Sequence, residues 1–236
     1  DSPQVVKRNI FPKVLNDIRL YYIEYFDYFM NQKNSLGLHS CFLDLDDPLE
    51  LFKIWMAEAE KKEINDPNAL ALATSSDSHQ PSVRMILLKG LSQKGFVFYT
   101  NLNSPKSHDL KKNPKASMCF HWKSLQRQIR ISGSVAQVSD KEADIYFNSR
   151  PYESRIGAWA SDQSNVMQQR SELIKKIEDY KNKYKDEKKL SRPKHWSGWC
   201  LNPSSIEFWL GDEYRIHERL RYKKISNIWK KEILYP

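Results

Sequence analysis

The sequence predicts a mostly β fold of the α+β class, an antiparallel β-barrel with helices at its periphery. Strand-like segments follow one another in runs, and they do not alternate with long helices as in a doubly wound sheet. The chain has 236 residues, 40% hydrophobic and 28% charged, which suits one globular core. It has no internal repeat and no stretch of linker composition, so we expect a single main domain over 47–236, preceded by a helical or lid segment over 1–46.

The first elements are helical. Apolar residues within 11–30 recur at helical spacing, and a loop follows over 31–45. A second helix is expected to begin at Asp47 and Pro48, because Asp caps helix N-termini well and Pro is tolerated in the first turn. Its apolar residues from Leu51 to Ala59 lie on one face.

The period changes to that of a strand at Ala69. Residues 69–76 predict a strand, and 83–89 (VRMILLK) and 95–100 (GFVFYT) predict two more, which we interpret as a hairpin joined by a short polar turn. Ser104 is then expected to cap a short helix that has Pro105 at its first position.

The rest of the chain continues this pattern to a total of about eight strands. Ser139 and Glu142 have capping-box spacing, which predicts a helix over 139–150. The other expected elements are strands over 115–122 and 127–138, helices over 152–161 and about 164–185, and strands over 204–211, 213–224 and 227–236.

Composition limits the classes of function. Cys41, Cys119 and Cys200 are isolated, with no CxxC, so we expect neither a disulfide framework nor a zinc site, and a reducing, cytoplasmic location. No apolar run approaches the roughly 20 residues that span a membrane. The net charge of +9 is compatible with nucleic acid or with anionic small ligands.

Several motifs are missing from the sequence. It contains no GxGxxG, no P-loop, no HExxH and no GxSxG, and its six histidines lack metal-ligand spacing. We therefore expect no metal, and we expect any demanding chemistry to belong to an organic cofactor.

The first cluster of candidate residues surrounds the predicted hairpin. Arg84 and Lys89 bracket one strand, Thr100 ends the next, and Lys106 follows at the start of a helix. Helix-start amides, hydroxyls and basic side chains all donate to oxyanions, so the arrangement favours a phosphate. The alternative is an ordinary hairpin with solvated charges at its ends.

Two further clusters combine basic and polar groups. Strand alternation places Gln126, Gln128 and Arg130 on one face, to meet either water or a ligand. Tyr146 and Arg150 lie four apart on a helix, and Ser154 follows a turn, so the three could clamp a phosphate. The alternative for Arg150 is a side chain that caps the helix C-terminus.

The last cluster lies near the C-terminus. Trp209 offers a flat surface, and Arg215, His217 and Arg219 alternate along the predicted strand 213–224. Alternation places the three on one strand face, where they need an anionic or electron-rich partner.

Together these segments resemble the FMN-dependent pyridoxine/pyridoxamine 5′-phosphate oxidase family over about residues 47–236. The resemblance rests on RMILLK (84–89), FYTNLNSPKSHDL (98–110), QRQ (126–128), YFNSRP (146–151), SRIGAWASDQS (154–164), IEFW (206–209) and RIHER (215–219). It implies a split β-barrel homodimer, with FMN in a cleft at the subunit interface and no nucleic-acid or membrane partner.

The resemblance also implies residue roles. The expected FMN contacts are Arg84, Tyr99, Thr100, Lys106, Gln128, Gln163, Ser164, Trp209 and Arg219, and Gln128 serves the FMN held mainly by the other subunit. The expected clamp on the substrate phosphate is Lys89, Tyr146, Arg150 and Ser154. Arg215 and His217 are expected to orient the pyridine ring against the flavin as the catalytic pair.

The implied reaction oxidises pyridoxine 5′-phosphate or pyridoxamine 5′-phosphate to pyridoxal 5′-phosphate, in vitamin B6 synthesis or salvage. O2 accepts the electrons and yields H2O2, and the amine substrate also releases ammonia.

This sequence departs from the family pattern at three places. Pro105 stands where family members usually have a second basic residue, Glu218 replaces an Asp in the RIHER segment, and the usual tail Arg-Leu-x-Pro is Ile-Leu-Tyr-Pro. Two alternatives therefore stay open: a non-catalytic FMN- or B6-phosphate-binding split-barrel protein, and, on net charge alone, a nucleic-acid-binding barrel.

Overall fold

The computed structural model describes residues 33–236, so the helix expected over 11–30 and most of the segment 1–46 lie outside the described residues. The chain divides into two compact units, residues 1–45 and 46–236. The described part of the first unit contains a short 3-10 helix, η1 (Ser40–Phe42), and a bridge between Lys33 and His39. Gly37 has φ +72 in the turn between them, a conformation that glycine adopts at little cost.

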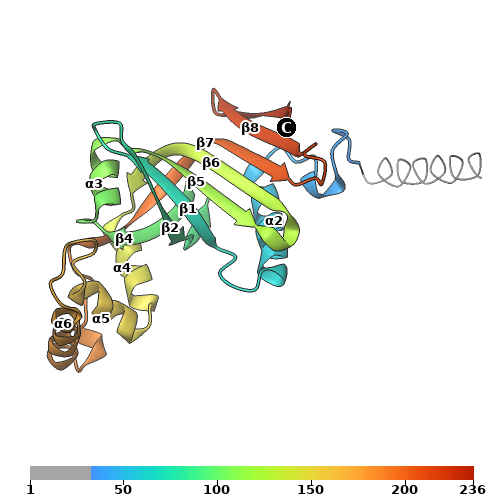
Figure 1. Cartoon of the computed structure of the whole chain (residues 1–236). Coiled ribbons are helices and arrows are strands. Elements are labelled where there is room, and N and C mark those ends of the chain that lie inside the picture. The colour runs from blue at the N-terminus through green and yellow to red at the C-terminus, as the bar shows by residue number, and fades with distance from the viewer. Residues whose placement is uncertain (1–32) are drawn as a thin grey trace, which may run out of the picture. The chain divides into compact units, whose positions relative to one another are not determined.

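The second unit is built on a nine-stranded antiparallel sheet with helices around it (Figure 1). The strands are β1 (Ala69–Ser75), β2 (Pro81–Leu87), β3 (Gly90–Ser92), β4 (Gly95–Asn101), β5 (Lys115–Trp122), β6 (Arg127–Gln137), β7 (Trp196–Leu210), β8 (Glu218–Ile225) and β9 (Ile228–Leu234). The helices are α2 (Pro48–Lys62), α3 (Pro105–Lys112), α4 (Asp140–Ser149), α5 (Tyr152–Ala160) and α6 (Arg170–Lys183), with 3-10 turns η2 (Lys123–Leu125) and η3 (Glu187–Lys189).

The strand order makes the sheet curl. It runs β2-β1-β5-β6-β7-β4-β3, with β8 and β9 added beside β7. β2 and β3 lie at opposite ends of this path although only two residues separate them in the chain, and Lys89 N donates to Val97 O of β4 at 2.8 Å. The sheet must therefore bend back on itself, which confirms the predicted antiparallel split barrel with peripheral helices.

The predicted hairpin of residues 83–89 and 95–100 is wrong as a pairing. β2 pairs with β1, whereas β4 pairs with β3 and β7. A tight two-strand hairpin needs only local contacts, but here the insertion of β3 turns the chain before β4 begins. Residues on β2 and β4 consequently meet across the curl of the barrel rather than side by side in one ladder.

The inner face of the sheet forms the core with α2. Alternation along β1, β5, β6 and β7 sends apolar residues inward, and α2 inserts Phe52 and Trp55 against them. Phe52 meets Phe96 edge-on at 4.9 Å between ring centroids, and Trp55 meets Phe208 at 5.1 Å. Each such side chain contributes about 1.5–3 kcal/mol through burial. Asp47 caps α2 by accepting from Leu49 N, as predicted.

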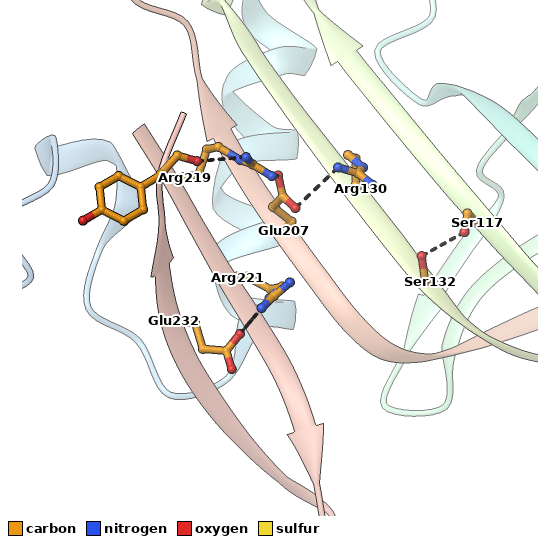
Figure 2. A network of polar contacts seen from close by, with 8 residues as sticks. Ser117, Arg130, Ser132, Glu207, Arg219, Arg221 and Glu232 are labelled. Carbon is orange, nitrogen blue, oxygen red and sulfur yellow. Dashed lines mark hydrogen bonds and ion pairs between the residues drawn. The ribbon is translucent and has the colours of Figure 1, made fainter. Parts of the chain in front are cut away.

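The outer face carries small and polar residues. Ala73, Ser117 and Ser132 share one cross-strand row, and the two serine hydroxyls lie 2.8 Å apart (Figure 2). Val83 and Met85 of β2 are 69% and 67% exposed beside them. This face is therefore partly apolar, and no other part of residues 33–236 covers Val83 and Met85.

Four further local predictions need correction. Ser104 precedes α3, but its hydroxyl makes no capping bond and donates instead to Asn101 O. Gln126 lies before β6 with φ +52, so only Gln128 and Arg130 share a strand face. The predicted helix 164–185 begins only at Arg170, and the predicted strand 204–211 is the second half of β7.

Candidate functional site

A cavity of about 350 Å³ opens where β2, β4, α3 and α4 approach one another. Most of the predicted phosphate-binding residues line it. The lining includes Arg84, Lys89, Tyr99, Thr100, Lys106, Tyr146, Arg150 and Gln163, together with Trp196. We call these residues the pocket half of the site.

Lys106 is the most enclosed cation of the pocket half. Lys106 is 9% exposed, and its Nζ donates to Gln163 Oε1 at 2.7 Å, Ser104 Oγ at 3.1 Å and Thr100 Oγ1 at 3.2 Å. All three acceptors are neutral. Burial, and then the nearby charge of Arg84, lower the pKa of Lys106 to about 8. An anion beside Lys106 would stabilise its charged form.

Arg84 is half-buried on β2 and is held by two hydroxyls and by two backbone carbonyls, those of Leu72 and Ser82. Its Nη1 donates to Thr74 Oγ1 at 2.7 Å, and its Nη2 donates to Ser82 Oγ at 2.6 Å. Burial lowers the pKa of Arg84, and the charge of Asp109 partly offsets this. The guanidinium is thus fixed in position at one wall of the cavity.

The opposite wall is aromatic. The rings of Tyr99 and Tyr146 stack with centroids 3.9 Å apart, and Trp196 continues the stack 5.3 Å from Tyr99. Burial raises the pKa of Tyr99 to about 12, with smaller contributions from neighbouring groups such as Glu142, so its hydroxyl stays protonated at neutral pH. The wall offers flat surfaces and phenolic donors.

Arg150 lies at the C-terminus of α4, with its guanidinium 4.8 Å from the centre of the Trp196 ring. Burial lowers its pKa, and its Nη1 is buried without a hydrogen-bond partner among the described residues. Ser154 lines an adjoining cavity of about 280 Å³, which shares Arg150, Gln163 and Trp196 with the first. Arg150 therefore separates two connected spaces and has a donor to spare for a ligand.

The electrostatics of the pocket half fit a phosphate. Among the described residues, Arg84, Lys106 and Arg150 form no ion pair, although all three are at least half-buried. Buried cations normally pair with anions, because desolvation disfavours an isolated charge. A phosphate group supplies both the missing charge and several acceptor oxygens.

A second group of predicted residues lies elsewhere in the unit, at the end of β7 and the start of β8. Trp209 faces His217, with ring centroids 4.6 Å apart, and is the cross-strand neighbour of Gln128 and Arg219. Arg219 donates from Nε and Nη2 to Glu207 Oε1 at 3.0 and 2.8 Å. We call Gln128, Trp209, Arg215, His217 and Arg219 the sheet-end half of the site.

Figure 2 shows how Glu207 holds this region together. The carboxylate is 7% exposed and lies between Arg219 and Arg130, whose Nη1 is 3.6 Å from Glu207 Oε2. Arg219 Nη1 also donates to Tyr235 O at 2.9 Å, which ties the C-terminal tail to β8. Arg219 is therefore anchored within its own chain.

The predicted ladder of Arg215, His217 and Arg219 on one strand face is wrong. β8 begins only at Glu218, and Arg215 has φ +63 in a turn. Asp212 creates this turn: its side chain accepts from Tyr214 N, and its own N–H donates to His217 Nδ1. Arg215 is exposed on the turn, whereas Arg219 belongs to the strand.

The two halves are far apart within one chain. Trp196, the first residue of β7, lines the pocket, and Trp209 is near the other end of this 15-residue strand. At roughly 3.3 Å per residue, about 40 Å of strand separates them. In Figure 1, α4 and α5 gather at one end of the curled sheet and β8 at the other. The sequence could not indicate this separation, because its motifs give order and not distance.

Sequence reasoning missed several residues of this region. Trp196 lines both cavities but was placed in no element, because Pro203 interrupts the strand pattern of β7. Pro203 is accommodated at a bulge opposite Gly133, where an added Cβ would lie 2.0 Å from Asn202 O. Thr74, Asp109 and Glu207 were also missed, since each acts on an arginine and not on the cavity itself. Ser164, with φ +72, follows Gln163 outside the main pocket.

A curled antiparallel sheet with a cationic, aromatic-walled pocket at one end defines a split-barrel protein with an anion-binding site. One solved structure of this fold is a pyridoxamine 5′-phosphate oxidase-related, FMN-binding protein from Nostoc punctiforme (TM-score 0.65, 15% identity, covering 82% of this chain and 100% of that one). A second is PhzG from Burkholderia lata, in complex with tetrahydrophenazine-1-carboxylic acid (TM-score 0.77, 30% identity, covering 82% and 94%).

The chain belongs to the pyridoxine/pyridoxamine 5′-phosphate oxidase family. Residues 56–184 match the family model for pyridoxamine 5′-phosphate oxidase, and 196–236 match the pyridoxine 5′-phosphate oxidase C-terminal dimerisation region. The chain is 63% identical over 208 residues to the pyridoxine/pyridoxamine 5′-phosphate oxidase of Pelagibacter ubique (88% of this chain, all of the relative). It is 48% identical to that of Allorhizobium ampelinum (83% of this chain, 95% of the relative).

Membership settles the general properties of the protein. The predicted family is confirmed, the chain is an oxidoreductase whose cofactor is FMN, and its C-terminal region is a dimerisation region. Within residues 33–236, no helix combines the length and the apolar character that crossing a membrane requires.

Proposed function

We propose that the protein oxidises pyridoxine 5′-phosphate or pyridoxamine 5′-phosphate to pyridoxal 5′-phosphate, with FMN as cofactor and O2 as electron acceptor. The observation that supports this most directly is the pocket half: three cations of the pocket wall have no ion-pair partner within residues 33–236, in a chain of this family. Cofactor and substrate each bring a phosphate, and several cations in connected cavities suit two such groups. Vitamin B6 synthesis or salvage is the corresponding pathway.

The pocket half divides naturally between the two phosphates. Arg84, Thr100, Lys106 and Gln163 form one polar wall and would hold the phosphate of FMN, with Tyr99 and Ser164 at its margins. Lys89, Tyr146, Arg150 and Ser154 lie along the aromatic wall and the adjoining cavity, and would clamp the phosphate of the substrate.

FMN, when bound, would supply the redox chemistry, namely acceptance of a hydride from C4′ of the substrate and reoxidation by O2 to give H2O2, and the amine product would release ammonia on hydrolysis. The residues of the chain bind and orient. Arg215 would position the substrate ring and stabilise charge, since an arginine does not act as a proton donor or acceptor in this pH range. His217 would present its ring beside Trp209.

The separation of the two halves supports a site shared between two copies. Gln128, Trp209 and Arg219, with Arg215 and His217, would come from one subunit, and the pocket half from the other. The C-terminal dimerisation region begins at residue 196 and contains all of the sheet-end half except Gln128. The uncovered outer face with Val83 and Met85 is a surface that a second copy could cover.

One assay tests the activity. The purified protein is expected to carry FMN and, with pyridoxine 5′-phosphate under air, to produce equal amounts of pyridoxal 5′-phosphate and H2O2. Protein without bound FMN, even after reconstitution, would contradict the proposal.

Bound FMN without turnover would favour the non-catalytic binder instead. The observation behind that candidate is Pro105, which is exposed at the first position of α3 and offers no cation there. We also propose that the protein acts in the cytoplasm and without nucleic acid, because its cysteines are isolated and its enclosed cations gather in a pocket, not on a stacking platform.

A further inference from the structure

Asp109 of α3 lies behind Arg84 and takes part in a closed hydrogen-bonded ring. Thr74 Oγ1 donates to Asp109 Oδ2 at 2.7 Å, and Ser82 Oγ donates to the same oxygen at 3.2 Å. Each of these hydroxyls also accepts from a different nitrogen of Arg84, Nη1 at 2.7 Å and Nη2 at 2.6 Å. One carboxylate oxygen thus faces two hydroxyls, and both hydroxyls face one guanidinium.

The direction of each bond to Asp109 and from Arg84 is determined by chemistry; the two hydroxyls also lie 3.2 Å apart, but the ionised carboxylate is the stronger acceptor for their protons. An ionised carboxylate only accepts and a guanidinium only donates, whereas a hydroxyl has one proton and two lone pairs. Asp109 therefore takes the single protons of Thr74 and Ser82, which leaves their lone pairs to accept from Arg84. Without the carboxylate the hydroxyls could rotate, and either could turn a proton toward the guanidinium.

The ring also links α3, the helix that carries Lys106, to β1 and β2. Lys106 and Asp109 are three residues apart on α3, so they lie on neighbouring positions of one helix face. Arg84 belongs to β2, at the edge of the sheet, and Thr74 of β1 is only 3% exposed between them. A carboxylate on the helix that carries Lys106 is therefore linked, through two hydroxyls, to an arginine on a different element.

We propose that Asp109 is a positioning residue that aims the Arg84 guanidinium at the phosphate of FMN through Thr74 and Ser82. This rests on the proposed function, in which Arg84 is a phosphate ligand. Two effects of Asp109 oppose each other at that phosphate: it orients the cation, and its own negative charge weakens the local positive field. We expect the orienting effect to increase FMN affinity by more than the negative charge of Asp109 decreases it.

The test compares FMN with riboflavin, which lacks the phosphate, on the full-length dimer freed of flavin. Flavin fluorescence gives the dissociation constants. For Asp109→Asn we expect the Kd for FMN to rise about tenfold, the lower end of what losing an outer-shell partner costs at metal sites. The Kd for riboflavin should stay within about twofold, since Arg84 does not reach the ring system in this proposal.

A double-mutant cycle separates positioning from a general structural role. On an Arg84→Ala background, Asp109→Asn should change the Kd for FMN by less than about twofold, because the residue acts through Arg84. Asp77→Asn is the matched control: it removes the same charge from the β1–β2 turn, where Asp77 pairs only with Lys112, and should leave both Kd values unchanged. Ser82→Ala, which breaks one leg of the ring, should raise the Kd for FMN by a smaller factor.

Three outcomes would overturn the inference. They are tighter FMN binding by Asp109→Asn, equal losses for FMN and riboflavin, and full additivity with Arg84→Ala. Should Asp109→Asn fail to fold, the same Kd measurements on Ser82→Ala, alone and combined with Arg84→Ala, test the inference instead. An unchanged Kd for FMN in Arg84→Ala alone would instead count against the proposed function, and this is a distinguishable result.

Discussion

Arg84 and Arg219 both depend on a carboxylate, but the two halves of the site use it differently. Arg219 pairs directly with the buried Glu207, so its charge is already compensated within its own chain. Arg84 meets Asp109 only through two hydroxyls, so that carboxylate offsets its charge only in part. The pocket half thus has positive charge left to bind an anion. The sheet-end half has its arginine charge compensated and exposes aromatic and polar side chains instead. The difference indicates which half binds phosphate.

The largest expected effect is on Lys106. Lys106→Met should weaken FMN binding by about a hundredfold or more, because a charge-assisted contact in an enclosed site is lost. The flavin-free protein should become more stable, since methionine needs no desolvation of a charge. Fluorescence titration and thermal unfolding check the two parts. A loss of stability together with FMN affinity would mean that the lysine is a structural residue.

Arg219 should show the opposite pattern. Arg219→Ala leaves the buried Glu207 with only the long contact to Arg130, and should destabilise the folded protein by about 2–3 kcal/mol. Chemical denaturation measures this. The matched control is Arg221→Ala on the same strand, whose pair with Glu232 is partly exposed (Figure 2) and should cost under about 1 kcal/mol. Equal effects in the two variants would remove the distinction between the halves.

Mixing two inactive variants tests whether one site takes its halves from two chains. Lys106→Met damages the pocket half and Trp209→Ala the sheet-end half. Random exchange of subunits should restore roughly a quarter of the wild-type sites, because half of the dimers are mixed and each mixed dimer has one intact site. The control mixes Lys106→Met with Arg84→Ala, both in the pocket half, and should restore nothing. Restoration in both mixtures would contradict a shared site.

The smallest expected effect is the change of stability and of FMN affinity with pH. The folded-state pKa of Lys106, about 8, is below the ordinary lysine value, so the unfolded state binds more protons between about pH 8 and 10.5. The contribution of Lys106 to stability in the flavin-free protein therefore increases as pH rises through this range. FMN affinity should fall several-fold over the same range, as the amine loses its charge. A Lys106→Met variant with the same pH profile would assign the effect to another group.

Local features of the fold could be predicted well from the sequence. Asp47 caps α2, Pro105 begins α3, and the Ser139 cap begins α4, since each depends on neighbours a few residues away. The predicted hairpin failed because the partners of β2 and β4 are determined by the curl of the whole sheet. The predicted ladder failed because Asp212 makes a turn with bonds that strand alternation cannot reveal.

The residues of the candidate site could be predicted from the sequence, but their arrangement in space could not. Resemblance identified Arg84, Lys106 and Arg150 as binding residues, and all three line one cavity. It did not reveal that Trp209 and Arg219 lie at the other end of β7. It also did not reveal Asp109 or Glu207, because a carboxylate that orients an arginine looks like any other surface acid in a sequence.

The length of β7 has a genetic consequence. In the proposed dimer, one end of each β7 strand lies in one site and its other end lies in the second site. Both sites of a dimer therefore contain residues from both copies of β7. When a damaged chain pairs with a normal one, two substitutions in the same half disable one site and leave the other intact. A chain with one substitution in each half instead disables both sites of the mixed dimer. The dominance of an allele with two such changes therefore depends on whether both changes fall in one half of the site or one falls in each half.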